Sequence, residues 1–515
     1  MKKGIIVLLL LITGSVWAGN RQKNENQKDS DYVVLASEAV RADSGWRGVV
    51  ETLQALHAAE VLFYSVSPEE TLEELRRLSP RYVAVVEKPE KINIEFVIGM
   101  HTLSRKVTPG IFAGFIWGMI TGVDAEAALN LVKRSTHPLM LRNGMVSQEK
   151  FVELKDGNWD KFACVSLGHS GFKGGEQDTL TIERWKTNRQ FEYFDRLYHE
   201  SDPDLLLSES YAPVYQFGLP DNGSVRERIE ARNGQFHYTA SEAKFQGRRV
   251  VERDTLHKDV DWSGGTKVYI ACGSWGCDVD RPEVSTALAW MKSANVTAMV
   301  GYPRTQLWGG PAAWGGLKFW KTLPGRYTMA EAYFLNQQHM LYTLNKFSPR
   351  LIEEAYDQNW NASRDLSKIK ESFKALTGKE IPGTYLLGCW QERDILAYFG
   401  DPKWDVRFRP EEASYTVKAV RKGKKYIVTL ITKENFYPED LDGNFFRMYS
   451  DDFLSAPTSI GKIPFSFIFP ERLKNPRLAP GQEWKVGLSG DMLLVYDEWF
   501  EPGKTYKFVL LTEDR

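Results

Sequence analysis

The stretch KVYIACGSWGCDVDRP, residues 267–282, decides the fold assignment. An apolar, β-branched run ends at Ala271, and a cysteine, small residues and a second cysteine follow at once. The run predicts a buried strand, and the residues after it predict a loop at the strand's carboxyl end. In an open parallel sheet, side chains just beyond the strand ends line the crevice where ligands bind. Cys272 is therefore a candidate site residue.

Three interpretations of Cys272 follow from the residues alone. It can be a nucleophile, with backbone N–H groups near Gly273 forming an oxyanion hole, provided that a base lies within hydrogen-bond reach. It can be a buried apolar side chain, because cysteine is among the most frequently buried residue types. It can also form a tight disulfide with Cys277. Spacing alone favours the last two interpretations over the first.

Composition places the chain among large globular proteins. It has 515 residues, of which 43% are hydrophobic and 26% charged, which predicts about three domains. The formal net charge of −1 argues against a nucleic-acid partner and against electrostatic attachment to membranes. Four cysteines are too few for a disulfide scaffold.

The N-terminus predicts export. Lys2 and Lys3 precede an apolar run, residues 5–12, and Ala18 ends a small-residue cleavage site. We expect a signal peptide over residues 1–18, a polar leader over 19–31, and a periplasmic, cell-surface or extracellular protein. The apolar run is too short to span a bilayer, and no later stretch is long enough, so no membrane span is expected.

The hydrophobic period divides the rest of the chain into four segments. Strand and helix patterns alternate over 32–160 and again over 161–345, which predicts two α/β units with parallel-type sheets. Within the second, residues 181–201 read as one helix and 235–240 as a hairpin strand. Residues 346–410 look like a connector. A period of two over 411–515, with a turn at Lys422-Gly423, predicts an immunoglobulin-like β-sandwich.

Common catalytic and cofactor motifs are absent from the sequence. There is no HExxH motif, CxxC pair, P-loop or GxSxG elbow, and the cysteines and histidines are scattered. We therefore expect neither a metal site nor a nucleotide cofactor.

Several segments resemble the gingipain-type cysteine peptidases, which are relatives of caspases. The order of LLLS, VYIAC, a helix and AMVGY resembles their catalytic sheet, and YVVLASEAVRADSGW, ALAWMKSANVTAMVGYP and ERDILAYFGDP strengthen the match. The resemblance covers roughly residues 31–405. It implies a caspase-like second α/β unit and an exported endopeptidase that acts on protein or peptide substrates, with Cys272 as nucleophile.

The expected histidine of the dyad is missing from its place in the sequence. The family has a His, commonly followed by Gly, at the end of one strand and the Cys at the end of the next. Here DLLLSES ends in Ser208 and Glu209, and no His-Gly dipeptide exists. His237 is the first substitute base, although it sits on a predicted hairpin, and His169 in GHSGF is the second. Glu209 is a poor activating base, because its negative charge raises a thiol pKa.

An aromatic loop follows the next predicted strand, so it would lie beside Cys272. Tyr302, Trp308 and Trp314 can wall a substrate groove or pack the two units together. Asp278 and Asp280 suit a basic substrate side chain, but helix capping is the simpler explanation.

Two functions remain open on the sequence. One is a gingipain-like cysteine endopeptidase with His237 or His169 as base. The other is a degenerate homologue that binds a peptide, a glycan or an envelope protein. A histidine ring at the Cys272 sulfur favours the first, and a crevice lined by Ser208 and Glu209 favours the second.

Overall fold

The computed structural model describes residues 31–513 with internal gaps. The residues left out are 148–153, 155–156, 167–168, 185–189, 209–215, 218–224, 247–248, 306–311, 355, 357–366, 379, 381–382, 438–462 and 497–499. The expected signal peptide and leader therefore lie almost entirely outside the described residues. Within these limits, no helix has the length and apolar character needed to cross a membrane.

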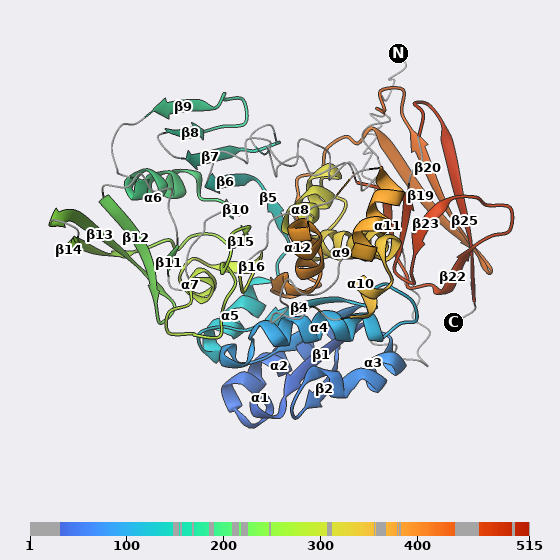
Figure 1. The fold of residues 1–515 in the computed structure, drawn as a ribbon, viewed down its shortest axis with the longest axis horizontal. Helices are drawn as coiled ribbons and strands as arrows, with labels where there is room; N and C mark the ends of the chain where they lie inside the picture. The colour runs from blue at the N-terminus through green and yellow to red at the C-terminus, as the bar shows by residue number, and fades with distance from the viewer. Residues whose placement is uncertain are drawn as a thin grey trace, which may run out of the picture.

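One twelve-stranded, mostly parallel sheet forms the centre of the protein (Figure 1). Its strand order is β2-β1-β3-β4-β17-β16-β15-β10-β6-β7-β8-β9. The strands are β1 (Tyr32–Ser37), β2 (Glu60–Tyr64), β3 (Tyr82–Val86), β4 (Ile116–Ile120), β6 (Asn143–Ser147), β7 (Lys161–Ser166), β8 (His169–Lys173), β9 (Thr181–Arg184), β10 (Leu205–Ser208), β15 (Lys267–Ala271), β16 (Val296–Gly301) and β17 (Ala397–Phe399). The mixed α/β class expected from the sequence is confirmed.

The two predicted α/β units share this single sheet and do not form two separate sheets; β6, from the first predicted unit, lies in the second half of the sheet beside β10. Strand β17, from the segment interpreted as a connector, joins the two halves: Phe399 lies opposite Met119 of β4 and Met299 of β16. Because β17 runs parallel to β4 and antiparallel to β16, the halves point in opposite directions. The carboxyl ends of β10 and β15 therefore lie at the opposite edge from those of β1 and β3.

Helices cover the sheet, and local sequence signals explain where several begin. They are α1 (Glu38–Ala42), α2 (Ser44–His57), α3 (Leu72–Leu78), α4 (Ile94–Lys106), α5 (Ala125–Arg134), α6 (Gln190–Ser201), α7 (Thr286–Ser293), α8 (Ala312–Thr322), α9 (Met329–Phe347), α10 (Arg350–Glu353), α11 (Ser367–Thr377) and α12 (Gly383–Ile395), with 3-10 turns η1 (Pro68–Thr71) and η2 (Pro89–Lys91). Ser67 and Glu70 form a capping box at the start of η1, and Asp124 caps α5.

The helix expected over residues 181–201 is only partly present. Thr181–Arg184 form β9, which pairs antiparallel with β8, and the helix α6 begins at Gln190. The first four residues are the β-branched Thr181 and Ile182 followed by the charged Glu183 and Arg184, and all four are exposed at the sheet edge. Edge pairing therefore overrides the helical reading of the first turn.

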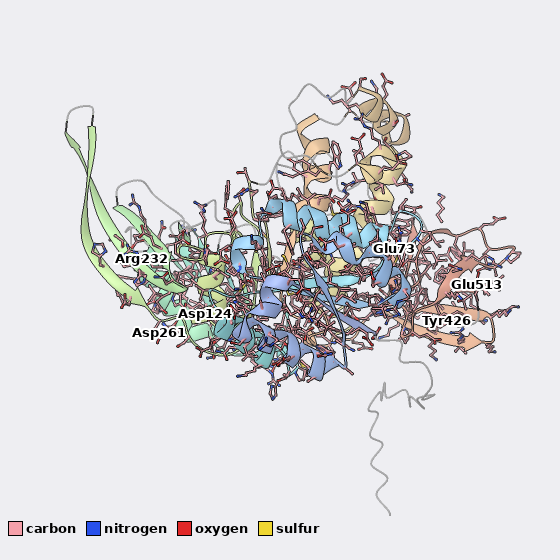
Figure 2. The ribbon with its side chains drawn as sticks, turned by 90° about the horizontal axis from the view of Figure 1, so that it is seen from below. Glu73, Asp124, Arg232, Asp261, Tyr426 and Glu513 are labelled. Atoms are coloured by element: carbon pink, nitrogen blue, oxygen red, sulfur yellow. The ribbon has the colours of Figure 1, made fainter. Side chains whose placement is uncertain are left out.

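A second, antiparallel sheet projects from the main sheet as an arm. It contains β11 (Gln216–Phe217), β12 (Val225–Arg232), β13 (Gln235–Gln246) and β14 (Arg249–Val260). The expected hairpin turn is confirmed, since Asn233 and Gly234 have φ values of 50° and 77°. Beyond Glu242, the only described strand that pairs with β13 is β14. Figure 2 shows this long hairpin extending past the rest of the protein.

The C-terminal segment forms two stacked antiparallel sheets. One is β19 (Tyr415–Lys422), β20 (Lys425–Thr432), β25 (Thr505–Glu513) and β22 (Lys474–Leu478); the other is β21 (Phe465–Ile468), β24 (Met492–Tyr496) and β23 (Lys485–Leu488). The rings of Phe465 and Phe508 stack between the sheets at 5.3 Å. An immunoglobulin-like topology is not confirmed, because among the described strands the last one, β25, lies beside β20. A small pair, β5 (Leu139–Leu141) with β18 (Val406–Phe408), completes the strands.

Candidate functional site

The strand pair that the sequence predicts for the dyad is present. Strands β10 and β15 are parallel neighbours, with Ser208 opposite Ala271. Cys272 follows directly, and its N–H donates to the Ser208 carbonyl at 2.8 Å. Strand β6 lies on the other side of β10, and β7 on the far side of β6, so the strand order reverses between β6 and β10. The carboxyl edge next to Cys272 is thus the part of this sheet where ligands are expected.

The loop after β15 folds back over the strand ends. The N–H of Cys277 donates to the Tyr302 carbonyl at 3.1 Å, which ties the loop to the chain after β16. Glycine is required at two close approaches: a Cβ at Gly276 would lie 2.8 Å from the Ala271 Cβ, and one at Gly301 would lie 2.6 Å from the Ala271 carbonyl oxygen. Trp275 has a φ of 65°, a strained backbone for an aromatic residue.

Both cysteines of this loop are thiols, so the disulfide alternative is not present in the described structure. Cys272 is 2% exposed and Cys277 is fully buried. Burial, followed by the neighbouring Asp278, raises the pKa of the Cys277 thiol well above its ordinary value. Cys277 is therefore a neutral core side chain at physiological pH.

The described surroundings of Cys272 contain buried polar side chains, namely tyrosines and one glutamate. The Ser208 and Tyr269 hydroxyls share a hydrogen bond of 2.5 Å, and Tyr269 was not among the predicted site residues. The Tyr302 hydroxyl donates to Glu392 of α12 at 3.0 Å and accepts from the Ala313 N–H at 3.1 Å. Tyr269, Tyr302 and Glu392 are all buried, and burial raises the pKa of both tyrosines. Tyr302 thus packs inside the protein and presents no open groove wall.

The acidic residues of the loop are paired within the chain. The Arg304 guanidinium lies 3.0 Å from Asp278 and 3.5 Å from Asp280, and it stacks on the Trp275 ring at 4.9 Å. Burial and the adjacent Asp280 nevertheless raise the pKa of Asp278 to about 7. The helix α7 is capped by Ser285, not by these carboxylates. An arginine of this protein thus occupies the place that a basic substrate side chain would take.

The structure places the two candidate bases away from Cys272. His237 lies in β13 of the arm, where its Nδ1 is 2.8 Å from Asp259 of β14. His169 begins β8, four strands from β15, which is roughly 19 Å at the usual strand spacing of about 4.8 Å; its side chain is outside the described part. The other described histidines also contact residues other than Cys272, namely His57 with Asp401, His101 with Leu396, His137 with Thr136, His199 with Asp195, His257 with Thr239 and His339 with Tyr496.

The remaining candidate residues are only partly described. Gly273 directly follows Cys272 and is partly exposed. Glu209 and Trp308 fall outside the described residues, and Trp314 is described by its backbone in α8 alone. Tyr269 and Glu392 were missed by sequence reasoning, because Glu392 lies 120 residues after Cys272 and only tertiary packing brings it to Tyr302. In the described residues, no group of His, Cys, Asp and Glu could hold a metal ion.

Comparisons with known proteins give a distant likeness. No family model and no curated protein matches the chain. Among solved structures, it is similar to the Arg-specific cysteine proteinase gingipain R, with 10% identity and a TM-score of 0.40 over 95% of this chain and 93% of that one. The complex of Porphyromonas gingivalis RgpB pro- and mature domains matches with 10% identity and a TM-score of 0.40 over 94% and 93%. These scores are too low to carry an argument, so function is judged from the residues.

Proposed function

We propose that this protein is an exported polypeptide-binding protein that does not cleave its ligand. The proposal rests on the residues at the ends of β10 and β15. Ser208 ends β10 and its hydroxyl is hydrogen-bonded to Tyr269, and Cys272, which follows β15, is 2% exposed. A serine committed to a neighbouring phenol cannot take the proton of a thiol.

Thiol catalysis needs a thiolate, and a thiolate needs a base or a positive charge close by. The described histidines contact other residues, and Arg281 and Arg304, the arginines at this loop, pair with Asp278 and Asp280. Tyr269, Tyr302 and Tyr333, which are described neighbours of Cys272, are neutral phenols whose pKa is raised by burial. This environment supports a structural role for Cys272 in the core.

A polypeptide ligand is supported by the sheet and by the sequence resemblance. The strand order reverses between β6 and β10, where Ser208 lies opposite Ser147. Ligands of open α/β sheets bind at such points. In the gingipain-type peptidases that the sequence resembles, the corresponding edge handles protein substrates. A sheet of this kind in which Ser208 ends β10, next to the strand that leads to Cys272, supports binding as the function of this edge.

Incubation with a tryptic digest of casein tests the proposal. After size-exclusion chromatography and mass spectrometry, we expect a subset of intact casein peptides to co-elute with the protein, with no new cleavage products. The variant Cys272→Ala should retain the same peptides, because Cys272 is 2% exposed and its sulfur packs in the core. Cys164→Ala, which removes a half-buried thiol on β7, is the matched control.

Two results would contradict this account. Cleavage products that form with the wild type and vanish with Cys272→Ala would show a cysteine peptidase. An absence of both retained peptides and cleavage products would contradict the binding proposal as well.

A further inference from the structure

Lysines cluster on the outer face of the C-terminal sheet formed by β19, β20, β25 and β22. Lys418 and Lys422 of β19, Lys425 of β20 and Lys507 of β25 project from this face. We call these four residues the lysine face. The opposite face of the same strands is buried against the second sheet, through Val428, Leu430, Phe508 and Leu510. Figure 1 shows the sheet at the end of the protein opposite the arm.

Within the described part of the chain, the charges of the lysine face are not neutralised. All four lysines are exposed, and none forms an ion pair with a described residue. Lys422 lies directly opposite Lys425 across β19 and β20, an arrangement that destabilises a sheet because like charges repel. The acid along β25, Glu513, lies opposite Lys474 of β22 instead. A repulsive pair without a counter-charge indicates a surface that meets an anion.

An apolar row runs between the lysines. Val420, Ile427 and Val509 lie side by side across the three strands, and Val420 is 49% exposed. Lys422 and Lys425 flank the row on one side and Lys418 and Lys507 on the other, each roughly 7 Å away along the strands. The face therefore offers an apolar strip between two lines of positive charge.

We infer that the lysine face docks on an anionic phospholipid surface. Lysines pair with lipid phosphates while an apolar strip enters the boundary between headgroups and acyl chains. A second copy of this chain is disfavoured, because it would set lysine against lysine. A soluble polyanion would gain nothing from the apolar row.

The net charge of −1 is compatible with this inference. This net charge argues against electrostatic attraction of the whole protein to an anionic membrane, but electrostatic interactions are screened beyond about 8 Å at physiological salt. Within that range, a docking surface responds to the four lysines and not to acids elsewhere on the protein. The lysine face belongs to a different sheet from β15, which leads to Cys272. This inference can therefore be tested independently of the proposed function.

Co-sedimentation with vesicles tests the inference. We use the chain from residue 19 onward, which lacks the apolar N-terminal run and keeps every described contact, since the described structure begins at Asp31. Wild type should bind vesicles of equal parts phosphatidylglycerol and phosphatidylcholine at low salt, and should not bind phosphatidylcholine alone. Each lysine at such a surface multiplies partitioning about fivefold, so Lys422→Glu/Lys425→Glu should lower it by about 25-fold or more.

A matched control separates the face from general charge. Lys91→Glu/Lys133→Glu makes the same charge change at exposed lysines of the first α/β half and should leave binding within about twofold, since these positions lie in η2 and α5 and not on the sheet that carries the lysine face. Val420→Ser should weaken vesicle binding and leave the fold intact. Failure of wild type to bind would overturn the inference. So would an equal loss in the control, or equally strong, Val420-independent binding to soluble dextran sulfate.

Discussion

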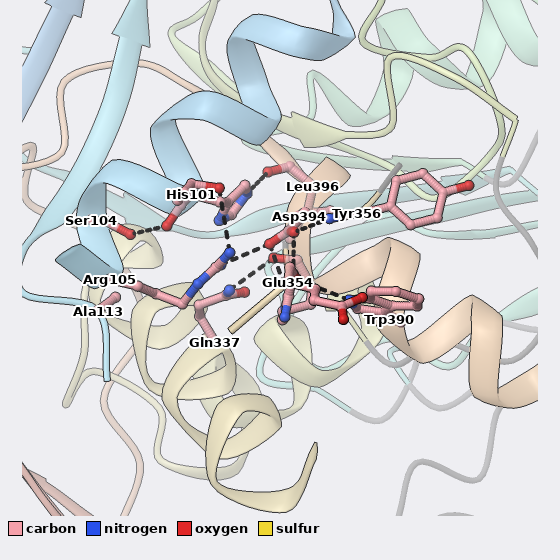
Figure 3. A network of polar contacts seen from close by, with 12 residues as sticks. His101, Ser104, Arg105, Ala113, Gln337, Glu354, Tyr356, Trp390, Asp394 and Leu396 are labelled. Carbon is pink, nitrogen blue, oxygen red and sulfur yellow. Dashed lines mark hydrogen bonds and ion pairs between the residues drawn. The ribbon is translucent and has the colours of Figure 1, made fainter. Parts of the chain in front are cut away.

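Replacing Asp394 by alanine should lower the free energy of unfolding by about 3–5 kcal/mol, the largest effect expected of any single carboxylate here. Asp394 of α12 is fully buried and lies 2.7 Å from the Arg105 guanidinium. It also pairs with Arg393, accepts from the Tyr356 N–H at 2.9 Å, and lies in the network shown in Figure 3. Without it, two buried guanidiniums lose their counter-charge.

The pH dependence of this contribution follows from the pKa of Asp394. Burial raises that pKa, but Arg105 and Arg393 together outweigh burial and hold it well below the ordinary value. A carboxyl with a depressed folded-state pKa contributes its stability above the unfolded-state pKa of about 3.9. The difference between wild type and Asp394→Ala should therefore be constant from pH 5 to 8.

Urea unfolding monitored by tryptophan fluorescence measures this difference. Asp405→Ala is the matched control, because Asp405 pairs with Arg407 at the surface with 57% of its side chain exposed; we expect a loss under about 1 kcal/mol. A loss of similar size in both variants would show that the buried network is not what holds α12. That helix also carries Glu392 to Tyr302, so the network positions one wall of the site.

Trp290→Ala should cost a similar amount, about 3–5 kcal/mol. Trp290 of α7 is 1% exposed and stacks on Trp262 at 5.0 Å with an interplanar angle of 11°. Phe236 of the arm meets it edge-on at 4.8 Å, and Tyr269 of β15 lies at 5.1 Å. Removing the indole opens a cavity where the arm, α7 and the main sheet join.

A graded series tests this role of Trp290. Trp290→Phe keeps most of the ring contacts, and its loss in urea unfolding should be less than half of that of Trp290→Ala. Equal losses for both variants, or a loss below about 1.5 kcal/mol for alanine, would contradict the assignment of Trp290 as the hub of the cluster.

Local patterns predicted much of the fold. The buried run before Cys272 and the hairpin at Lys422-Gly423 each depend on residues close in sequence. Pairings between distant segments were not predictable in this way. The union of both halves rests on Phe399 of β17 meeting Met119, 280 residues earlier, and no local pattern signals that register.

For the candidate site, too, the sequence predicted the local features and not the contacts between distant segments. The sequence placed Cys272 at the end of a strand beside the strand that ends in Ser208, which the register confirms. It could not show that Ser208 is bonded to Tyr269, because both belong to buried strands whose side-chain directions depend on register. Nor could it connect Tyr302 with Glu392, which α12 supplies from far along the chain.

The central claim, that Cys272 is a core thiol and not an activated nucleophile, is tested most directly by alkylation. Iodoacetamide is applied to the native and the urea-unfolded protein from pH 5 to 9, and mass spectrometry reports each cysteine, with half-buried Cys164 as internal reference. The account predicts that Cys272 reacts at least about 100-fold more slowly in the native protein than in the unfolded chain at every pH, because reaction requires local opening. Modification of native Cys272 faster than in the unfolded chain below the ordinary thiol pKa would contradict it and identify an active cysteine enzyme.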